Sequence, residues 1–373
     1  MIEGKAAVAR EKSQPLEIVD ARFEAPRTGE VLVRIVGTGV CHTDMVVRDQ
    51  GYPVPLPLVL GHEGAGVVEQ VGDGVTTLAP GDHVVLSYGH CGRCGECRSG
   101  RPGYCVEFYD RNFKGSRMDG SQAVCDAHGH PLGSAFFAQS SFGTYAIATE
   151  RNAIKIRSDV PLELMGPLGC GIQTGAGAVL NALKPPAASS IAIFGAGSVG
   201  LSAAMAAAAV GCTTIILVDL HDDRLALAKE LGATHGVNAG KEDAVERIRE
   251  ITGTGGADFT LECTGNPKVL AQAVEALRIP GTCGLIGAAN LGDCASLDMN
   301  TLLFGRTVRG IIEGDSVPQV FIPQLIELWR AGRFPFDRLI AFYDLADINQ
   351  AIADSESGRV LKPIVRPASG ANA

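Results

Sequence analysis

The stretch that decides the fold of this chain is IAIFGAGSVG, at residues 191–200. Four apolar residues, Ile191 to Phe194, predict a buried strand, and the glycines follow where the strand would turn into a helix. In that setting the glycines permit a tight turn and close approach of a pyrophosphate, and the helix N-terminus faces the phosphates. The stretch therefore predicts a dinucleotide-binding turn, made by Gly195, Gly197, Ser198, Val199 and Gly200.

An acidic residue follows about 20 residues later, at the distance this type of turn requires. Asp219 ends the apolar run Ile215 to Val218, and its carboxylate can accept hydrogen bonds from the adenosine ribose while it repels a 2′-phosphate. We therefore predict NAD rather than NADP. Arg224 is a second candidate for a ribose neighbour but equally fits a charge on a helix surface, and a solvated strand end is the simpler alternative for Asp219.

The pattern of elements around this stretch divides the chain into two parts. From Ser190 onward, apolar runs alternate with helical segments, which is typical of a parallel, doubly wound sheet. We expect this dinucleotide-binding domain to cover residues 173–312, and a second domain to combine residues 1–172 with residues 313–373. The second domain is predicted to be rich in short strands, for example over residues 30–36, 64–71, 82–87 and 145–148.

Four cysteines have the spacing C-x2-C-x2-C-x7-C, at Cys91, Cys94, Cys97 and Cys105. Neighbouring thiolates repel one another, so a cluster this dense favours a divalent cation, and four sulfur ligands leave no position open for a substrate. We therefore predict a structural zinc site. A disulfide-linked lobe and an iron–sulfur cluster are the alternatives, because bacterial cluster motifs also begin with C-x2-C-x2-C.

The composition argues against several classes of partner. A formal net charge of −9 disfavours a nucleic-acid or anionic-membrane surface, which would need clustered Lys and Arg. Eleven cysteines, an odd number, do not resemble the disulfide framework of a secreted protein. The longest apolar run is far shorter than the roughly 20 residues of a membrane span. We expect a cytoplasmic protein that acts on a small molecule and binds neither nucleic acid nor membranes.

Three short motifs elsewhere in the chain combine cysteine and histidine with carboxylates or glycines. They are Cys41-His42-Thr43-Asp44, Gly61-His62-Glu63-Gly64 and Gly166-Pro167-Leu168-Gly169-Cys170-Gly171. Taken singly, such a cysteine is usually a buried apolar residue and such a histidine a satisfied polar one. With the four-cysteine cluster, the glycine turn and the closing Lys362-Pro363-Ile364-Val365, they resemble the zinc-dependent medium-chain alcohol dehydrogenases over essentially the whole chain.

This resemblance implies an α/β protein with a GroES-like, zinc-binding catalytic domain and a Rossmann domain, assembled as a homodimer or homotetramer. It implies two zinc ions per chain, the second held by Cys41, His62 and Cys170 with a fourth position left for water or substrate. That zinc is expected to act as a Lewis acid that promotes loss of the alcohol proton, while hydride passes from the alcohol carbon to NAD and an aldehyde forms.

The resemblance also assigns roles to residues next to the ligands. Thr43 would contact the substrate oxygen and pass its proton towards the nicotinamide ribose. Asp44 would orient the histidine ligand through its other ring nitrogen, and Glu63 would lie behind the metal. His42 and Lys362, at two basic positions of the family, would contact the cofactor pyrophosphate. A structural salt bridge or a surface charge is the simpler alternative for the charged residues in this set.

The chain departs from its relatives at positions that shape the substrate site. Val46 lies where many relatives carry a histidine that ends the proton relay, and Ser87 lies where they often carry a large aromatic side chain. Loss of that wall leaves room for a bulky, flat substrate, with Tyr52, Ala288 and Ile312 as further candidates for the pocket wall. These features resemble the benzyl and allylic terpene alcohol dehydrogenases of bacteria, so we expect primary alcohols of the benzyl, cinnamyl or geraniol type.

Two other functions stay open at this point. A glutathione-dependent formaldehyde dehydrogenase needs a basic residue near the outer pocket, and Arg111, Lys114 and Arg117 follow the last cysteine of the cluster. A non-enzymatic NAD-binding or zinc-storage protein on the same fold is the second alternative. The intact set of ligands, together with the hydroxyl of Thr43, argues against the latter.

The valine at position 46 permits a test of the proton path. We expect the proton to leave through Thr43 and the ribose to solvent, with His42 as the alternative base. Val46→His adds an imidazole base to this path, so the pH dependence of kcat should change. Profiles of kcat against pH measure this, with Val46→Leu as the control that keeps an apolar side chain. Superimposable profiles for Val46→His and the unmodified enzyme would contradict the path.

Overall fold

The computed structural model describes residues 1–367. They form two compact units. The first combines Met1–Cys170 with Val317–Gln324 and with the segment from Asp337 onward, and the second combines Gly171–Ser316 with Leu325–Phe336. Within residues 1–367, no helix combines the length and the apolar character needed to cross a membrane.

The second unit is built on a six-stranded sheet in which all neighbouring strands are parallel. In spatial order the strands are β13 (His235–Asn238), β12 (Thr214–Asp219), β11 (Ser190–Phe194), β14 (Ala257–Glu262), β15 (Leu277–Leu285) and β16 (Thr307–Gly310). The chain winds outward in opposite directions from β11 and β14, as in dinucleotide-binding folds. The predicted doubly wound sheet is confirmed, and the glycine turn follows its central strand β11.

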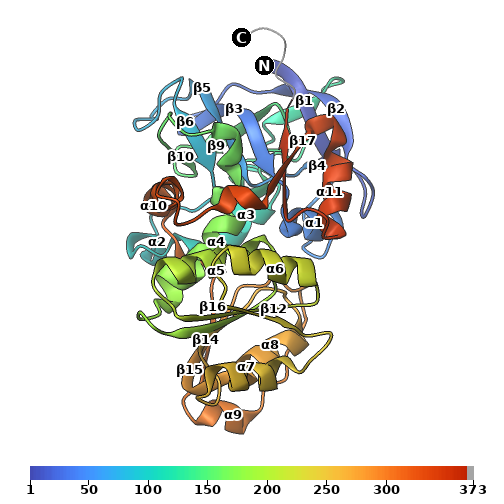
Figure 1. Ribbon diagram of the computed structural model, residues 1–373. Helices are drawn as coiled ribbons and strands as arrows, with labels where there is room; N and C mark the ends of the chain where they lie inside the picture. Colours follow the sequence, from blue (N-terminus) through green and yellow to red (C-terminus); the bar gives the residue numbers. More distant parts are fainter. Residues whose placement is uncertain (368–373) are drawn as a thin grey trace. The chain divides into compact units, whose positions relative to one another are not determined.

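Helices cover both faces of this sheet. Figure 1 shows α5 (Ser198–Ala209) and α6 (Asp222–Glu230) on one side of it, and α7 (Ala244–Thr252) and α8 (Pro267–Glu275) on the other. The side chains of Asp243 and Asn266 cap α7 and α8, because each accepts a hydrogen bond from a backbone N–H in the first turn. The unit also contains α4 (Gly171–Gly177) and α9 (Met299–Leu303).

The first unit contains two mainly antiparallel sheets, which confirm the predicted β-rich domain. The larger runs in the order β10 (Ala153–Lys155), β6 (His83–Leu86), β5 (Gly64–Val71), β3 (Glu30–Gly39), β18 (Lys362–Arg366) and β17 (Ile340–Asp344), and β9 (Tyr145–Thr149) pairs with β3. The smaller runs in the order β4 (Leu58–Val59), β1 (Ile2–Ala9), β2 (Glu17–Phe23), β7 (Val124–Asp126) and β8 (Pro131–Leu132).

The C-terminal segment returns to the N-terminal part of the chain in this unit. Strand β18 pairs antiparallel with β3, with Ile364 opposite Gly39 and Val365 opposite Thr38. The return brings Lys362 next to the end of β3, where the first predicted metal ligand, Cys41, follows. The remaining helices are α1 (His42–Arg48), α2 (Gly95–Arg98), α3 (Phe108–Phe113), α10 (Pro318–Arg330), which runs from the first unit into the second, and α11 (Ile348–Glu356).

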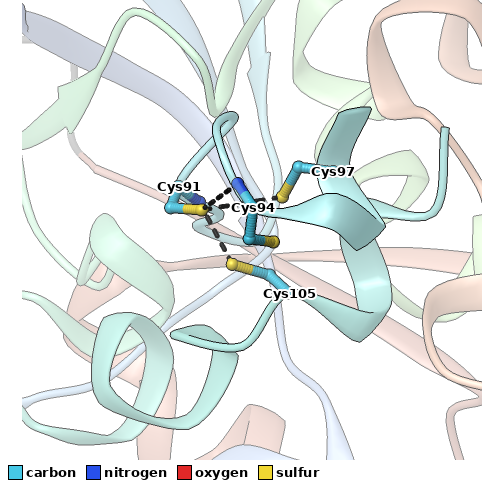
Figure 2. Close-up of side chains that lie close together, drawn as sticks. All are labelled: Cys91, Cys94, Cys97 and Cys105. Atoms are coloured by element: carbon cyan, nitrogen blue, oxygen red, sulfur yellow. Dashed lines mark hydrogen bonds between the residues drawn. The ribbon is translucent and has the colours of Figure 1, made fainter. Parts of the chain in front are cut away.

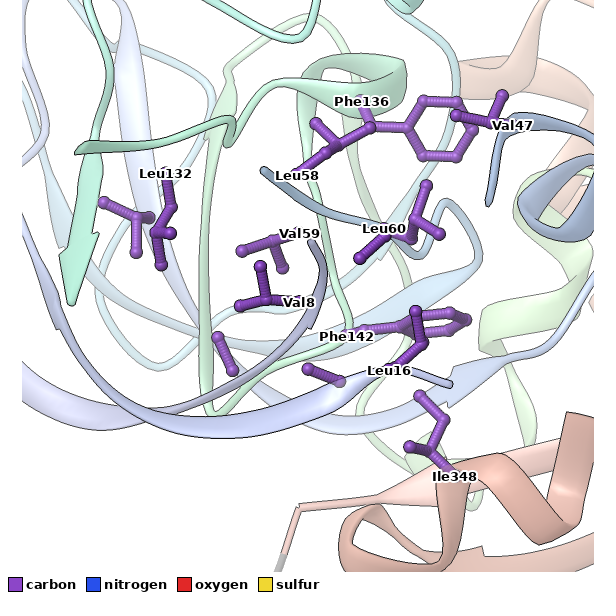
Figure 3. Close-up of a cluster of buried hydrophobic side chains, with 14 of the residues drawn as sticks. Val8, Leu16, Val47, Leu58, Val59, Leu60, Leu132, Phe136, Phe142 and Ile348 are labelled. Atoms are coloured by element: carbon purple, nitrogen blue, oxygen red, sulfur yellow. The ribbon is translucent and has the colours of Figure 1, made fainter. Parts of the chain in front are cut away.

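A buried apolar cluster fills the first unit (Figure 3). It joins Val8 of β1, Leu58 of β4 and Ile348 of α11, which lie far apart in the sequence. Val47 and Phe136 belong to the same cluster. Since Val47 follows the first metal-ligand motif closely, the core and the candidate site are parts of one packed region.

This packing predicts the effect of a truncation in the cluster. Leu58 is fully buried, so Leu58→Ala should lower the free energy of unfolding by about 2–5 kcal/mol through lost burial and a residual cavity. The side chain of Leu220 is 64% exposed, and Leu220→Ala should change that free energy by about 0.5 kcal/mol or less. Urea unfolding followed by circular dichroism compares the two, and equal effects would contradict the placement of Leu58 in the core.

Candidate metal centres and cofactor site

The first unit brings together residues from all three cysteine and histidine motifs. One donor atom each from Cys41, His62, Glu63 and Cys170 lies within 4.8 Å of all the others. Cys41 precedes α1, His62 and Glu63 precede β5, and Cys170 ends the segment before α4. Two thiols and an imidazole thus converge from three separate segments, as a metal site of the predicted kind requires.

The hydrogen bonding of His62 shows that this cluster fits a metal ion. His62 is fully buried, and its Nε2 atom has no hydrogen-bond partner among residues 1–367. A buried ring nitrogen without a partner is costly, unless its lone pair is directed at a ligand such as a cation. A hydrogen bond from Cys170 lowers the pKa of the Cys41 thiol well below its usual range, with burial opposing and His62 assisting the shift. The donor set therefore fits zinc.

The carboxylate of Asp44 fixes the orientation of the imidazole. Its Oδ1 atom lies 2.9 Å from Nδ1 of His62 and accepts the N–H of Gly61 at 3.0 Å, and its Oδ2 atom accepts the N–H of Cys41 at 2.9 Å. Asp44 is fully buried in the first turn of α1, directly after Cys41. One carboxylate therefore connects the two turns that carry Cys41 and His62.

Glu63 forms a buried ion pair with Lys362. The Nζ atom of Lys362 lies 2.9 Å from both carboxylate oxygens of Glu63 and 3.2 Å from the carbonyl oxygen of Val40. Burial raises the pKa of Glu63 to about 7, against the opposing effect of Lys362. Burial lowers the pKa of Lys362, but the neighbouring Glu63 more than offsets this and raises it overall.

The contact of Lys362 with the cofactor phosphates stays a prediction, because the partners that the structure shows are all protein groups. An ammonium group has three donors, and three acceptors within the first unit surround it. The side chain is also only 2% exposed. The sequence could not reveal this, because the partner Glu63 lies about 300 positions away and is reached only through the pairing of β18 with β3.

Aromatic side chains that sequence reasoning missed surround His62. The Phe137 ring stacks on the imidazole at a centroid distance of 4.5 Å, and the Phe136 ring meets it edge-on at 5.3 Å. Phe113 of α3 packs against Phe137 at 5.2 Å, and the predicted pocket residue Tyr52 packs against Phe113 at 5.6 Å. Nothing in the local sequence around Phe136 and Phe137 indicates that these rings lie beside His62.

Ser87 does not line an open pocket, contrary to the prediction from its small size. It is fully buried, and its Oγ atom donates a hydrogen bond to the carbonyl oxygen of Gly169 at 2.6 Å. The hydroxyl is therefore used to hold the segment that leads to Cys170. The aromatic rings that contact His62 belong to Phe136 and Phe137, which are themselves almost fully buried.

Other predicted site residues occupy α1 or the second unit. Thr43 is half-buried with Oγ1 at 4.0 Å from the Sγ atom of Cys41, His42 is exposed and Val46 is half-buried. Ala288 and Ile312 are exposed residues of the second unit. The role of each in catalysis or substrate binding stays a prediction.

The four cysteines of the lobe converge as predicted. Figure 2 shows their sulfur atoms directed towards one another, and all four lie within 4.8 Å of each other. The distance between the sulfurs of Cys91 and Cys97 is 3.9 Å, close to the roughly 3.8 Å expected for two thiolates on one tetrahedral zinc. All four thiols are free rather than paired in disulfides.

Backbone N–H groups favour the thiolate form in this lobe. The N–H groups of Arg93 and Cys94 donate to the sulfur of Cys91, and those of Cys91 and Glu107 donate to the sulfur of Cys105. Such bonds lower the pKa of Cys94 to about 6, whereas burial raises that of Cys97 to about 12. The lobe thus fits a closed structural zinc site.

The glycine turn of the second unit has the geometry predicted for a dinucleotide. Gly195 has a φ of +102°, and its N–H donates to the carbonyl oxygen of Val218 at 2.8 Å. A Cβ atom at Gly200 would lie 1.9 Å from the carbonyl oxygen of Gly195, whereas one at Gly197 would meet nothing within 4 Å. The backbone is therefore tightly packed at Gly200, whereas the space beside Gly197 is free for a pyrophosphate to approach.

Asp219 lies beside this turn at the end of β12. Its Oδ2 atom accepts the N–H of Ala196 at 2.6 Å, and its Oδ1 atom accepts those of Leu220 and His221. Nη1 of Arg224 is 4.0 Å from the same carboxylate. The two predicted ribose neighbours are therefore together at the turn, and Ser198 and Val199 begin α5 immediately after it.

Comparisons with known proteins agree with this architecture. Residues 27–158 match the family described as alcohol dehydrogenase GroES-like domain, and residues 198–330 match the zinc-binding dehydrogenase family. The geraniol dehydrogenase of Castellaniella defragrans is 50% identical over 368 residues, which cover 98% of this chain and 98% of that protein. The S-(hydroxymethyl)glutathione dehydrogenase of Paracoccus denitrificans is 35% identical over 371 residues, covering 97% and 99%.

A solved structure extends the comparison to three dimensions. The crystal structure of benzyl alcohol dehydrogenase from Acinetobacter calcoaceticus has a TM-score of 0.95 to this chain at 51% identity, covering 99% of this chain and 100% of the other. The predicted family and the predicted combination of a GroES-like with a Rossmann domain are thereby confirmed. The chain belongs to the zinc-dependent medium-chain alcohol dehydrogenases.

Proposed function

We propose that this protein oxidises primary aromatic or allylic alcohols, of the benzyl alcohol or geraniol type, to aldehydes with NAD as the hydride acceptor. The observation that carries the proposal is the unpartnered Nε2 atom of His62 beside the thiols of Cys41 and Cys170, with aromatic rings packed against the imidazole. The names of the geraniol and benzyl alcohol dehydrogenases that are about half identical to this chain support the same substrate class.

The roles of the residues follow from their contacts. Zinc held by Cys41, His62 and Cys170 would supply a Lewis acid for the alcohol oxygen, and NAD would supply the hydride acceptor. Asp44 accepts the Nδ1 proton of His62 and so keeps the lone pair on Nε2. Glu63 and Lys362 neutralise each other's charge, so that neither adds an uncompensated charge near the thiolates.

Thr43 is the residue proposed to take up the alcohol proton. Its hydroxyl lies 4.0 Å from the sulfur of Cys41, at the start of α1. A hydroxyl can accept one proton while it donates its own, so the proton can pass on towards solvent without a buried base. Val46, one turn further along the helix, offers no group that titrates.

Most of the proposed cofactor contacts come from the second unit. The backbone around Gly197 and the N-terminus of α5 would bind the pyrophosphate, and Asp219 would accept hydrogen bonds from the adenosine ribose hydroxyls. The carboxylate repels a 2′-phosphate, so NAD is favoured over NADP. Arg224 beside it would pack against the adenosine.

The aromatic rings near His62 favour a flat apolar substrate. Phe137 is almost fully buried against the imidazole, whereas Phe113 and Tyr52 are half-buried and offer ring surface on which an unsaturated substrate can stack. Tyr52 extends the group of rings through its edge-on contact with Phe113.

The contacts of the basic residues disfavour the formaldehyde dehydrogenase alternative. Arg111 is bonded to Glu107, Lys114 donates to the carbonyl oxygen of Met118, and Arg117 is bonded to Glu24 and Glu30. Arg111 and Arg117 are therefore already paired with carboxylates, and of these three cations only Lys114 keeps a charge for a glutathione carboxylate. The intact ligand set likewise disfavours a non-enzymatic binding protein.

We further propose that the chain works in the cytoplasm as a homodimer or homotetramer. None of the eleven cysteines forms a disulfide within residues 1–367, which is consistent with a reducing compartment. The oligomeric state is carried over from the family, in which edge strands of the cofactor-binding sheets pair between subunits; β16 is such an edge strand here.

Substrate preference tests the proposed substrate class. We expect kcat/KM for benzyl alcohol, cinnamyl alcohol and geraniol to exceed that for ethanol by at least about tenfold, because ethanol leaves the aromatic surfaces uncovered. NADH formation with the purified enzyme measures this. Faster turnover of hydroxymethylglutathione than of any of these alcohols would overturn the proposal in favour of the formaldehyde dehydrogenase branch.

Metal content tests the two zinc sites separately. The purified protein should hold about two zinc ions per chain by elemental analysis. Cys170→Ala should lose one of them together with alcohol oxidation, and Cys94→Ala should lose the other. Cys125→Ala, which alters a half-buried cysteine outside both clusters, is the control and should keep both. Retention of two zinc ions by Cys170→Ala would show that Cys170 is not a ligand.

A further inference from the structure

A turn with an unusual backbone conformation lies against the histidine of the proposed catalytic centre. Phe137, Ala138 and Ser140 have φ angles of 50°, 54° and 48°, although none of them is glycine. Side chains make this left-handed region unfavourable, so such residues persist only where the surrounding structure imposes the conformation. Because the Phe137 ring stacks on the imidazole of His62, whatever imposes this turn also acts on the metal ligand.

The buried side chain of Gln139, in the middle of this turn, is bonded to the segment that carries His62. Its Oε1 atom accepts the N–H of Gly64 at 3.1 Å, and its Nε2 atom donates to the carbonyl oxygen of His62 at 2.9 Å. The side chain is fully buried, so neither bond is exchanged with water. One amide group thus ties the turn that presents Phe137 to the backbone of His62 itself.

Ser87 extends this connection to a second ligand. The Nε2 atom of Gln139 also donates to the carbonyl oxygen of Ser87 at 3.2 Å, and the Oγ atom of Ser87 donates to the carbonyl oxygen of Gly169 at 2.6 Å. Gly169 directly precedes Cys170. The backbones of His62 and Cys170 are therefore joined through Gln139 and Ser87 by a continuous path of buried hydrogen bonds.

We propose that Gln139 is a positioning residue for the catalytic metal, which acts with Ser87 to set the separation of the His62 and Cys170 backbones and holds Phe137 against the imidazole. The inference rests on the proposed function, in which Cys41, His62 and Cys170 bind zinc. Gln139 contacts the backbone of a ligand rather than the reacting groups. Its effect should therefore appear first in how tightly and in what geometry the metal is held.

Asn152 offers a matched control for this proposal. It is also a buried amide, and its Nδ2 atom donates to the carbonyl oxygens of Ser87 and Ala138, which belong to the same region. It makes no hydrogen bond to His62 or Gly64 in the part of the chain that the structure describes. If Gln139 serves only to fill and stabilise the core, replacing either amide should have the same consequences.

The experiment compares Gln139→Met with Asn152→Leu, because each replacement removes the amide and roughly keeps the side-chain volume. Zinc release from the holoenzyme to the chelator 4-(2-pyridylazo)resorcinol gives one phase for each zinc, and the four-cysteine site serves as an internal reference. The visible d–d spectrum of the enzyme with cobalt in the catalytic site reports the ligand geometry. Thermal unfolding reports any general loss of stability.

We expect Gln139→Met to release the catalytic zinc at least about tenfold faster and to alter the cobalt spectrum, with release from the four-cysteine site unchanged. Asn152→Leu should change neither, even where it lowers the unfolding temperature as much. Equal release rates and equal cobalt spectra for the two variants would overturn the proposal.

A variant that does not fold and an enzyme without the catalytic zinc are the two remaining outcomes. Should Gln139→Met fail to fold, Ser87→Ala removes the bond to Gly169 and should still speed release of the catalytic zinc about threefold or more. An unchanged rate would then refute the connection. An unmodified enzyme that holds zinc at the four-cysteine site alone would instead refute the proposed function on which the inference rests.

Discussion

The buried carboxylate of Asp44 is the constraint on which the candidate active centre depends. It accepts hydrogen bonds from the backbone N–H groups of Cys41 and Gly61 and lies within hydrogen-bond distance of Nδ1 of His62. A carboxylate excluded from water is strongly destabilising unless such donors surround it. The loss of any one of these hydrogen bonds should therefore lower the stability of the fold. Their geometric consequence is that two turns about 20 residues apart are held together, with the second imidazole nitrogen left facing the thiols. Asp44 therefore positions two of the proposed metal ligands although it is not one of them itself.

Close backbone contacts reinforce this arrangement. Each proposed ligand is closely preceded by a glycine that has no room for a side chain. A Cβ atom at Gly39 would lie 2.0 Å from Glu63, one at Gly61 would lie 2.5 Å from Phe142, and one at Gly169 would lie 2.0 Å from the carbonyl oxygen of Leu86. Because these glycines have no side chain, the three segments can pack closely enough against their neighbours for the proposed ligands to converge. Phe136, which belongs to the apolar cluster of the first unit, also contacts the imidazole of His62.

Predictions from the sequence were accurate for features that depend on the spacing of residues close together in the chain. The glycine turn, the four-cysteine cluster and the alternation of strands and helices each depend on residues close together in the chain, and the structure has them as expected. The contacts of Lys362 and Ser87 could not be predicted, because distant segments make up their environments. Lys362 meets Glu63 only after β18 has paired with β3, and Ser87 meets Gly169 only after the first unit has closed. Phe137 and Gln139 carry no local signal of their position beside His62 for the same reason. The sequence thus revealed which chemistry is present, whereas tertiary packing determines what surrounds it.

The most direct test of this account is anomalous diffraction at the zinc absorption edge from a crystal of the purified enzyme. The account predicts two peaks per chain. One should lie among the sulfurs of the four-cysteine lobe, and the other should lie at bonding distance, about 2.0 to 2.3 Å, from the sulfurs of Cys41 and Cys170 and from Nε2 of His62. An enzyme active with alcohols and NAD that shows a peak only in the lobe would contradict the central claim, since the unpartnered nitrogen of His62 would then need another explanation.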